Sequence, residues 1–408
     1  MRQNFQQTIL NLAHFLDHYF LLIFPTAVIA IERDWELGYG EALALGTPMY
    51  VALALATLPA GWLGDRLSRQ WLIGVFFIGC GGAGISTGLA TSPAGLAIGL
   101  TLLGACAAIY HPVGLAMVTE CARRPGRALA INGVYGNLGL AGAAVATGWL
   151  ADQFGWRSAF LIPGLVSVAV GTVYLFSIRR SGIGHKAGLK TSVRNHKARD
   201  RVVQIRVMTF VIAAALFGGA VFNAVTVSLP KLFDERLLSS EVDLSDLGAY
   251  VAMVFTIAAF AQLPVGDILD RFGARVLLAV LLPVQVASLV IIANTDRPLV
   301  IPVATLLVLM LFAEIPVTAW LLGQYVAPNW RARAFSVEYM LSLGVGAAIV
   351  PAIAWGYESG IGFDRQYLVL GAASSIVFAA VLVLPAWEGT QRIHRTRTSH
   401  ANGTINDN

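Results

Sequence analysis

The chain has 408 residues, of which 57% are hydrophobic and only 12% are charged, and its mean hydropathy is +0.70. Soluble globular proteins carry about 25% charged residues, so this composition excludes a soluble enzyme, a nucleic-acid-binding protein and a disordered chain. The formal charge of +5 would suggest nucleic acid in a soluble protein, but here it is expected to reflect basic loops on the cytoplasmic side of a membrane.

Apolar runs long enough to cross a bilayer, about 20 residues each, follow one another along the chain. Twelve such runs, in two groups of six, lie at 8–31, 41–63, 70–90, 93–119, 128–151, 156–178, 207–231, 246–266, 275–294, 298–326, 333–357 and 366–386. The sequence therefore predicts an all-α integral membrane protein with twelve transmembrane helices in two six-helix bundles. Its predicted parts are an N-terminal bundle at 1–178, a basic linker at 179–206, a C-terminal bundle at 207–387 and a tail at 388–408.

The placement of Lys and Arg predicts the orientation of these helices. With both termini in the cytoplasm, 22 of the 28 Lys and Arg residues fall in cytoplasmic segments, nine of them in the linker. Cytoplasmic loops of membrane proteins carry such an excess of Lys and Arg. We therefore expect both termini to be cytoplasmic, in a multi-pass protein of a bacterial-type inner membrane. The same count places no Lys or Arg deep in any predicted span.

The two groups of spans repeat each other in sequence. Residues 58–66 (LPAGWLGDR) match residues 263–271 (LPVGDILDR), and Pro112-Val113 matches Pro316-Val317 at nearly the same offset. Two halves with six helices of the same orientation are the parallel-repeat architecture of many secondary transporters.

Residues 61–70 (GWLGDRLSRQ) resemble the cytoplasmic signature of the major facilitator superfamily, Gly-x-x-x-Asp-Arg-x-Gly-Arg-Arg/Lys, with Ser68 and Gln70 as departures. The second half carries a copy at 266–275. This resemblance implies a rocking transporter whose cytoplasmic gate is closed by charged residues of these loops; the alternative is that they only anchor helix ends. The expected gate residues are Gly61, Asp65, Arg66, Arg69, Glu120, Asp270, Arg271 and Glu338.

A finer resemblance joins residues 14–17 (HFLD), 110–112 (YHP) and 126–130 (GRALA) to the fosmidomycin-resistance-like branch of the superfamily, whose members export drugs in exchange for protons. The proline of the antiporter motif expected in the fifth span is absent from this chain. That span instead has a glycine at every third position from Gly133 to Gly142, which we interpret as close helix packing.

Ionisable residues at membrane depth cost about 2.5–3.5 kcal/mol each on insertion scales, so those present usually have a function or a partner. His14, Asp17 and His18 are spaced i, i+3, i+4 and share one helix face. This group suits a proton-coupling site. Contact with substrate, ligation of a transition metal, and purely structural hydrogen bonds remain alternatives.

His111 and Glu314 occupy nearly equivalent positions of the two halves, each beside a proline that can interrupt its helix. We expect both to face a central substrate cavity, although each also fits a buried, hydrogen-bonded residue. Aromatic and amide side chains at similar depth complete the predicted site, namely Tyr110, Asn137 and Trp320. The absence of deep Lys or Arg favours a neutral or cationic substrate over an anion.

These observations predict a secondary active transporter that moves a small organic solute by alternating access, in proton-coupled efflux. Uptake of a transition metal, metal chelate or nutrient through the same fold is the alternative. No phosphate loop or serine-elbow motif supports an enzyme. We expect a monomer that needs no cofactor or resident metal, with protons and the lipid bilayer as its other partners and no nucleic acid.

Overall fold

The computed structural model describes residues 2–121, 125–181, 201–237, 243–295, 299–326 and 328–385, and within these ranges it is helical without strands. The predicted all-α membrane fold is confirmed. Most of the predicted linker and the tail lie outside the described residues, as do several loop residues. In chain order the elements are α1 (Arg2–Asp34), α2 (Tyr39–Ala44), α3 (Thr47–Arg66), α4 (Arg69–Gly88), α5 (Pro93–Ala107), α6 (Tyr110–Cys121), α7 (Pro125–Phe154), α8 (Ser158–Ser181), α9 (Arg201–Ala213), the π-helical turn η1 (Ala214–Gly218), α10 (Gly219–Leu237), α11 (Leu244–Ala259), α12 (Gln262–Ala293), α13 (Val300–Tyr325), α14 (Pro328–Gly344), α15 (Gly346–Glu358) and α16 (Phe363–Val381).

Within the described ranges, eleven helical segments are long and apolar enough to cross a membrane. They correspond to the first eleven predicted spans, several of which are broken into two helices. The last predicted span corresponds to α16, which begins with the polar residues Asp364, Arg365 and Gln366 and is not among the eleven. Large apolar side chains such as Leu55, Trp355 and Val369 are about 70% exposed, as expected for a surface that faces lipid.

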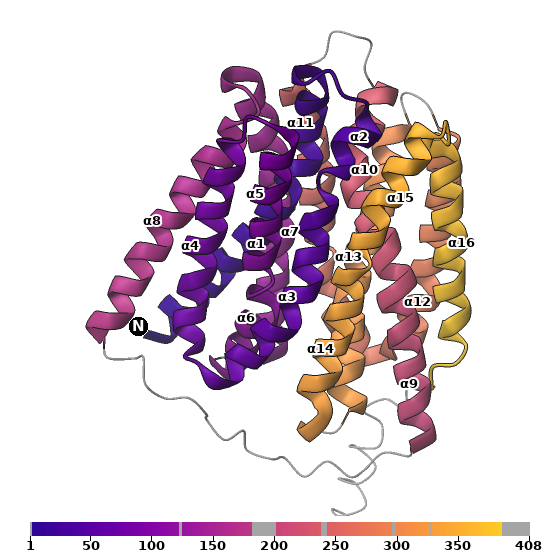
Figure 1. The fold of residues 1–408 in the computed structure, drawn as a ribbon. Helices are drawn as coiled ribbons and strands as arrows, with labels where there is room; N and C mark the ends of the chain where they lie inside the picture. Colours follow the sequence, from indigo (N-terminus) through magenta and orange to yellow (C-terminus); the bar gives the residue numbers. More distant parts are fainter. Residues whose placement is uncertain are drawn as a thin grey trace, which may run out of the picture.

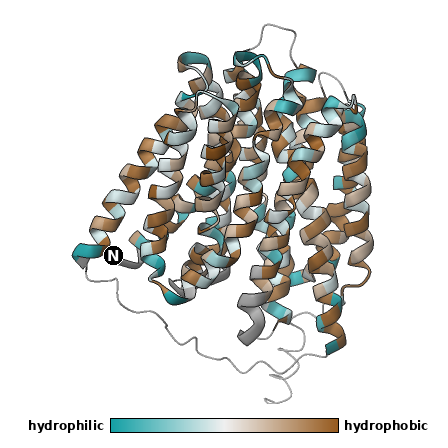
Figure 2. Cartoon of the chain, viewed as in Figure 1, coloured by the Kyte–Doolittle hydropathy of each residue, from teal (hydrophilic) through white to brown (hydrophobic). Residues whose placement is uncertain are grey.

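The helices run roughly side by side in two groups, α1–α8 and α9–α16 (Figure 1). The N-terminus, the end of α8 and the start of α9 all lie at one end of the bundle, which we call the lower end; the opposite end is the upper end. Hydrophilic residues gather near both ends and apolar residues cover much of the middle (Figure 2). The groups meet where α7 packs on α11 and where α3 packs on α14 and α15.

Glycines allow the closest approach between the groups. A Cβ on Gly148 would lie 2.3 Å from the Leu244 carbonyl oxygen, and one on Gly248 would lie 2.3 Å from that of Ala144. Any side chain at these positions would push α7 and α11 apart. Small residues of this kind are typical of tightly packed transmembrane helices.

One of the differences between the two copies of the loop signature, Ser68 in the first and Gly273 in the second, has a conformational reason. Gly273 has a φ of 76°, a left-handed conformation that favours glycine, and it forms the break within α12 between two spans. Ser68, the equivalent residue of the first copy, has a φ of −64° and caps α4 by accepting a hydrogen bond from the Trp71 amide. The departure from the family signature at Ser68 is therefore compatible with the local backbone.

Candidate functional site

The polar face predicted on α1 lies inside the bundle. His14 and Asp17 are buried, with Asp17 fully so, and His18 is half-buried. The neighbouring element is α6, whose first residues are Tyr110, His111 and Pro112. The helix is interrupted at Ala108 and Ile109, between α5 and α6. Pro112 therefore falls in the first turn of a new helix, where its missing N–H is tolerated.

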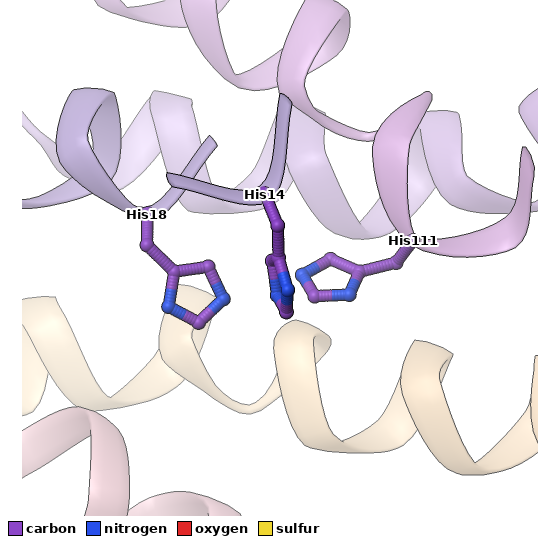
Figure 3. A group of neighbouring side chains, drawn as sticks. All are labelled: His14, His18 and His111. Atoms are coloured by element: carbon purple, nitrogen blue, oxygen red, sulfur yellow. The ribbon is translucent and has the colours of Figure 1, made fainter. Parts of the chain in front are cut away.

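The break brings His111 against the face of α1, so that His14, Asp17, His18 and His111 form one group, which we call the histidine cluster. Figure 3 shows its three histidines. The His111 Nε2 atom lies 3.2 Å from Asp17 Oδ2, which is an ion-pair distance without hydrogen-bond alignment. The rings of His14 and His18 meet edge to face with centroids 4.7 Å apart, and His111 lies 5.5 Å and 5.6 Å from them. One ring nitrogen of each histidine lies within 4.8 Å of those of the other two, so the cluster is also a candidate metal site.

Asn132 of α7 holds this cluster in place. Its carbonyl oxygen accepts a hydrogen bond of 2.7 Å from His14 Nδ1, and its side-chain oxygen accepts one of 2.9 Å from the Tyr110 hydroxyl. The Asn132 amide nitrogen donates to the Asn11 side chain at 3.0 Å. The sequence reasoning did not include Asn132 or Asn11 in the site; the only signal was that Asn132 aligns with Glu338 across the repeat.

The glycines of α7 make this packing possible, which agrees with the interpretation of their spacing. A Cβ on Gly136 would lie 2.7 Å from His14 Nε2, and one on Gly139 would lie 2.1 Å from the Phe15 carbonyl oxygen. A Cβ on Gly133 would lie 2.4 Å from Gln262 Oε1 of α12, in the other group of helices. The same helix face thus serves both an internal contact and a contact between the groups.

The histidine cluster reaches the second group of helices through α14. The rings of His111 and Tyr339 are stacked with centroids 5.3 Å apart. Glu338, next to Tyr339, is buried and accepts hydrogen bonds from Thr318 at 3.3 Å and Ser342 at 3.4 Å. Glu338, predicted as a gate residue, therefore belongs to a buried polar group beside the cluster.

The other predicted substrate residues are on α13 and α7. Glu314 is on α13, and its buried Oε1 atom has no hydrogen-bond partner among the described residues. Trp320 lines a small hollow with Arg275 and Tyr325 near the break in α12. Asn137 of α7 is buried and its amide nitrogen has no hydrogen-bond partner within the same ranges.

The predicted cytoplasmic gate is described only in part. The side chains of Asp65, Glu120 and Asp270 lie outside the described residues. The Arg66 guanidinium lies 3.9 Å from the centre of the Trp62 ring, and Arg69 Nε donates to the Gly64 carbonyl at 3.0 Å.

The remaining predicted gate residues are Gly61 and Arg271, and among the described residues neither makes a close contact that would indicate a gate. A Cβ on Gly61 would make ordinary contact with Pro112 at 3.5 Å, whereas one on Gly64 would come within 3.0 Å of Val113. The tighter helix approach is therefore at Gly64. Arg271 is exposed.

Charged side chains join the two groups of helices at the upper end. Lys231 of α10 bridges Glu32 of α1 at 2.6 Å and Asp234 at 3.0 Å, and its side chain is only 10% exposed. Arg33 adds a more exposed pair with Asp234 at 3.3 Å. The Gly40 amide donates to Glu358 of α15 at 2.9 Å. No sequence signal links Glu32 with Lys231, 199 positions apart.

The comparisons with known proteins agree with this architecture. The family model described as Major Facilitator Superfamily matches residues 10–351. The chain is 24% identical to the "Gallate transporter" of Pseudomonas putida, over 90% of this chain and 87% of the relative. It is 25% identical to the "Multidrug resistance protein MdtG" of Escherichia coli (strain K12 / DH10B), over 91% of both chains.

Solved transporter structures share the fold. A POT family transporter in complex with 5-aminolevulinic acid superposes with a TM-score of 0.74 at 12% identity, covering 92% of this chain and 95% of that one. A bacterial homolog of the human lysosomal transporter Spinster, in an inward-facing and unoccupied conformation, gives 0.69 at 16% identity, covering 93% and 96%. The family match, which spans most of the chain, shows that this protein belongs to the major facilitator superfamily and is a multi-pass membrane transporter, not an enzyme.

Proposed function

We propose that this transporter moves a small neutral or cationic organic solute by alternating access, in proton-coupled efflux, and acts as a monomer. The observation that carries the proposal is the buried histidine cluster, which lies between the two groups of helices below a closed upper end. The named relatives, a multidrug resistance protein and a gallate transporter, support a small organic solute as the substrate class.

In this proposal the proton is carried by Asp17, with His14 and His18 beside it. Asp17 is fully buried, and its contact with a charged or chargeable group is with His111 at 3.2 Å. A buried carboxylate without a fixed cation is costly unless it is neutralised. Proton uptake removes that cost and proton release restores the charge, so the state of Asp17 can be coupled to the rocking of the halves.

The substrate would lie against the same polar surface, between His111 and Tyr110 in one half and the Glu338 region of the other. Asn137, Glu314 and Trp320 are further proposed substrate contacts, taken from their depth in the sequence. No Lys or Arg approaches the cluster among its ion pairs and ring contacts within the described ranges, which favours a neutral or cationic solute over an anion.

Proteoliposomes with an imposed pH gradient test this proposal, with the cation ethidium as the transported probe and the anion gallate as the probe that should not be transported. Asp17→Asn is expected to abolish gradient-driven accumulation of the transported probe and the accompanying pH change, while exchange of the probe across the membrane persists. Asp34→Asn, at an acid that pairs with Arg157 at the upper end and belongs to no proposed site, is the control, and it should retain gradient-driven transport. Wild-type coupling in Asp17→Asn would refute the assignment.

The proposed orientation places the lower end in the cytoplasm, because 22 of the 28 Lys and Arg residues then lie inside. The proposed gate at this end comprises Asp65, Arg66 and Arg69 of the first signature and the residues of its second copy. Asp65→Asn is expected to reduce transport several-fold with normal membrane insertion, measured as initial rate per inserted protein. An unchanged rate would remove Asp65 from the gate.

A further inference from the structure

Several buried atoms of the histidine cluster have no hydrogen-bond partner among the described residues. They are His14 Nε2, both carboxylate oxygens of Asp17 and both ring nitrogens of His111. Buried polar atoms without a partner are rare in folded proteins, and each one calls for a ligand, a water molecule or an ion. Two of them, Asp17 Oδ2 and His111 Nε2, face each other at 3.2 Å, and the other three, on three neighbouring side chains, indicate one shared ligand.

The tautomer of His14 is fixed in the form that binds a metal. A carbonyl oxygen only accepts hydrogen bonds, so the 2.7 Å contact with the Asn132 carbonyl places the ring proton on Nδ1. The Nε2 atom then keeps its lone pair. Metal-binding histidines in proteins are oriented by the same kind of bond from the other ring nitrogen. Because a Cβ on Gly136 would lie 2.7 Å from Nε2, glycine at this position leaves the space beside the lone pair open.

The other two imidazoles face the same place. In Figure 3 a ring nitrogen of His18 and one of His111 point toward the His14 ring, which lies between them. The three candidate nitrogens lie within 4.8 Å of one another. Nitrogens that share a tetrahedral zinc ion at 2.0–2.1 Å are about 3.4 Å apart. Side-chain rotations that move each nitrogen by roughly one ångström would therefore bring all three within bonding distance of one metal ion.

We propose that the histidine cluster binds one divalent transition-metal ion, with His14, His18 and His111 as nitrogen ligands and Asp17 as the fourth ligand. Three imidazoles and one carboxylate suit Zn²⁺, Co²⁺ or Ni²⁺, whereas Ca²⁺ and Mg²⁺ prefer all-oxygen sites. The site lies at the interface between the halves because His111 stacks on Tyr339 of α14. The ion would compete with the proposed proton for Asp17, but its binding does not depend on which solute is carried or in which direction.

The test is binding of Co²⁺ and Zn²⁺ to the purified full chain without an affinity tag. The chain has seven histidines, and the other four, at positions 185, 196, 394 and 400, lie outside the described residues. Their replacement by Gln in the background removes competing imidazoles. We expect one Co²⁺ per chain with the intense visible absorption of a tetrahedral complex, no thiolate charge-transfer band, and displacement by Zn²⁺.

His18→Gln and His111→Gln are each expected to weaken Co²⁺ binding by about tenfold or more, and Asp17→Asn by about tenfold. His18→Gln is the safest variant for folding, because its ring contacts are with His14 and His111 rather than with the Asn132 network. Unchanged melting temperatures confirm intact folds. Stoichiometric binding that survives all three substitutions, or no tetrahedral Co²⁺ in the folded parent chain, would overturn the proposal. Neither result depends on transport, so the metal site and the proposed function fail separately.

Discussion

The two groups of helices meet through buried polar side chains at two levels, and the two levels neutralise charge differently. At the upper end Glu32 and Asp234 share the ammonium group of Lys231, a cation built into the chain. In the histidine cluster, Asp17 is more deeply buried, and its ion-pair partner among the described residues is an imidazole, which is charged only when protonated. The upper level is therefore stabilised by a fixed cation, and the histidine cluster depends on a mobile one.

This difference assigns different tasks to the two levels. A fixed ion pair between α1 and α10 stabilises the closed upper end in every protonation state of the cluster. Asp17 has no fixed cation beside it, so the relative stability of the helix arrangements depends on which ligand or proton binds at the cluster. A transporter needs both properties, since a gate must close firmly and the binding level must respond to its ligands. The following substitutions test this division.

The largest effect is expected from removal of the fixed cation. Lys231→Met leaves the half-buried Glu32 without its partner Lys231 and Asp234 with the exposed Arg33, and breaking a buried ion pair in this way costs about 3–5 kcal/mol. We expect the upper end to open. Labelling of a cysteine at Ala27, which is fully buried in α1, by a membrane-impermeant maleimide measures this opening in a background without native cysteines.

Arg33→Met is the matched control for Lys231→Met. Arg33 pairs with the same Asp234, but its side chain is 59% exposed, and exposed pairs contribute about 0–1 kcal/mol. Labelling should remain low in this variant. The double variant Lys231→Met/Glu32→Gln should recover part of the closed state. Equal labelling in the lysine and arginine variants would contradict the assigned difference between these two pairs.

A smaller effect is expected when the packing that supports the cluster is disturbed. Gly136→Ala places a methyl group 2.7 Å from His14 Nε2, so the ring must move away from its bond with Asn132. Overpacking of this kind costs about 1–3 kcal/mol. The melting temperature of the purified protein should fall. Gly82→Ala on α4, where a Cβ meets nothing within 4 Å, is the matched control and should not lower it.

The sequence predicts the fold well because membrane spans are long and periodic signals. Hydropathy, the basic linker and the repeated signature are local patterns, and each can be found without knowing any contact. The face formed by His14, Asp17 and His18 was predictable for the same reason, since helix geometry alone brings these residues together.

Contacts between distant helices could not be predicted in this way. The bridge from Lys231 to Glu32 and the network around Asn132 depend on how helices rotate and cross, which no local pattern records. For Glu314 the repeat predicts the depth, and its place in a central cavity stays a prediction; its buried Oε1 atom has no hydrogen-bond partner among the described residues. The position of His111 beside α1 follows from its helix break, which is itself a local signal.

The smallest expected effect concerns the single ring that connects the cluster to the second half. Stacked aromatic pairs contribute about 0.5–1.5 kcal/mol beyond the area they bury, so Tyr339→Leu should lower the transport rate about three- to tenfold without abolishing proton coupling. Tyr339→Phe keeps the stacked ring on His111 and is the matched control, expected near the wild-type rate. A loss in Tyr339→Phe equal to that in Tyr339→Leu would show that the hydroxyl matters rather than the stack. In that case a hydrogen bond of Tyr339 would connect the two halves beside the histidine cluster. The cluster and the ion-paired upper end would then differ less, because both would be held together by polar bonds.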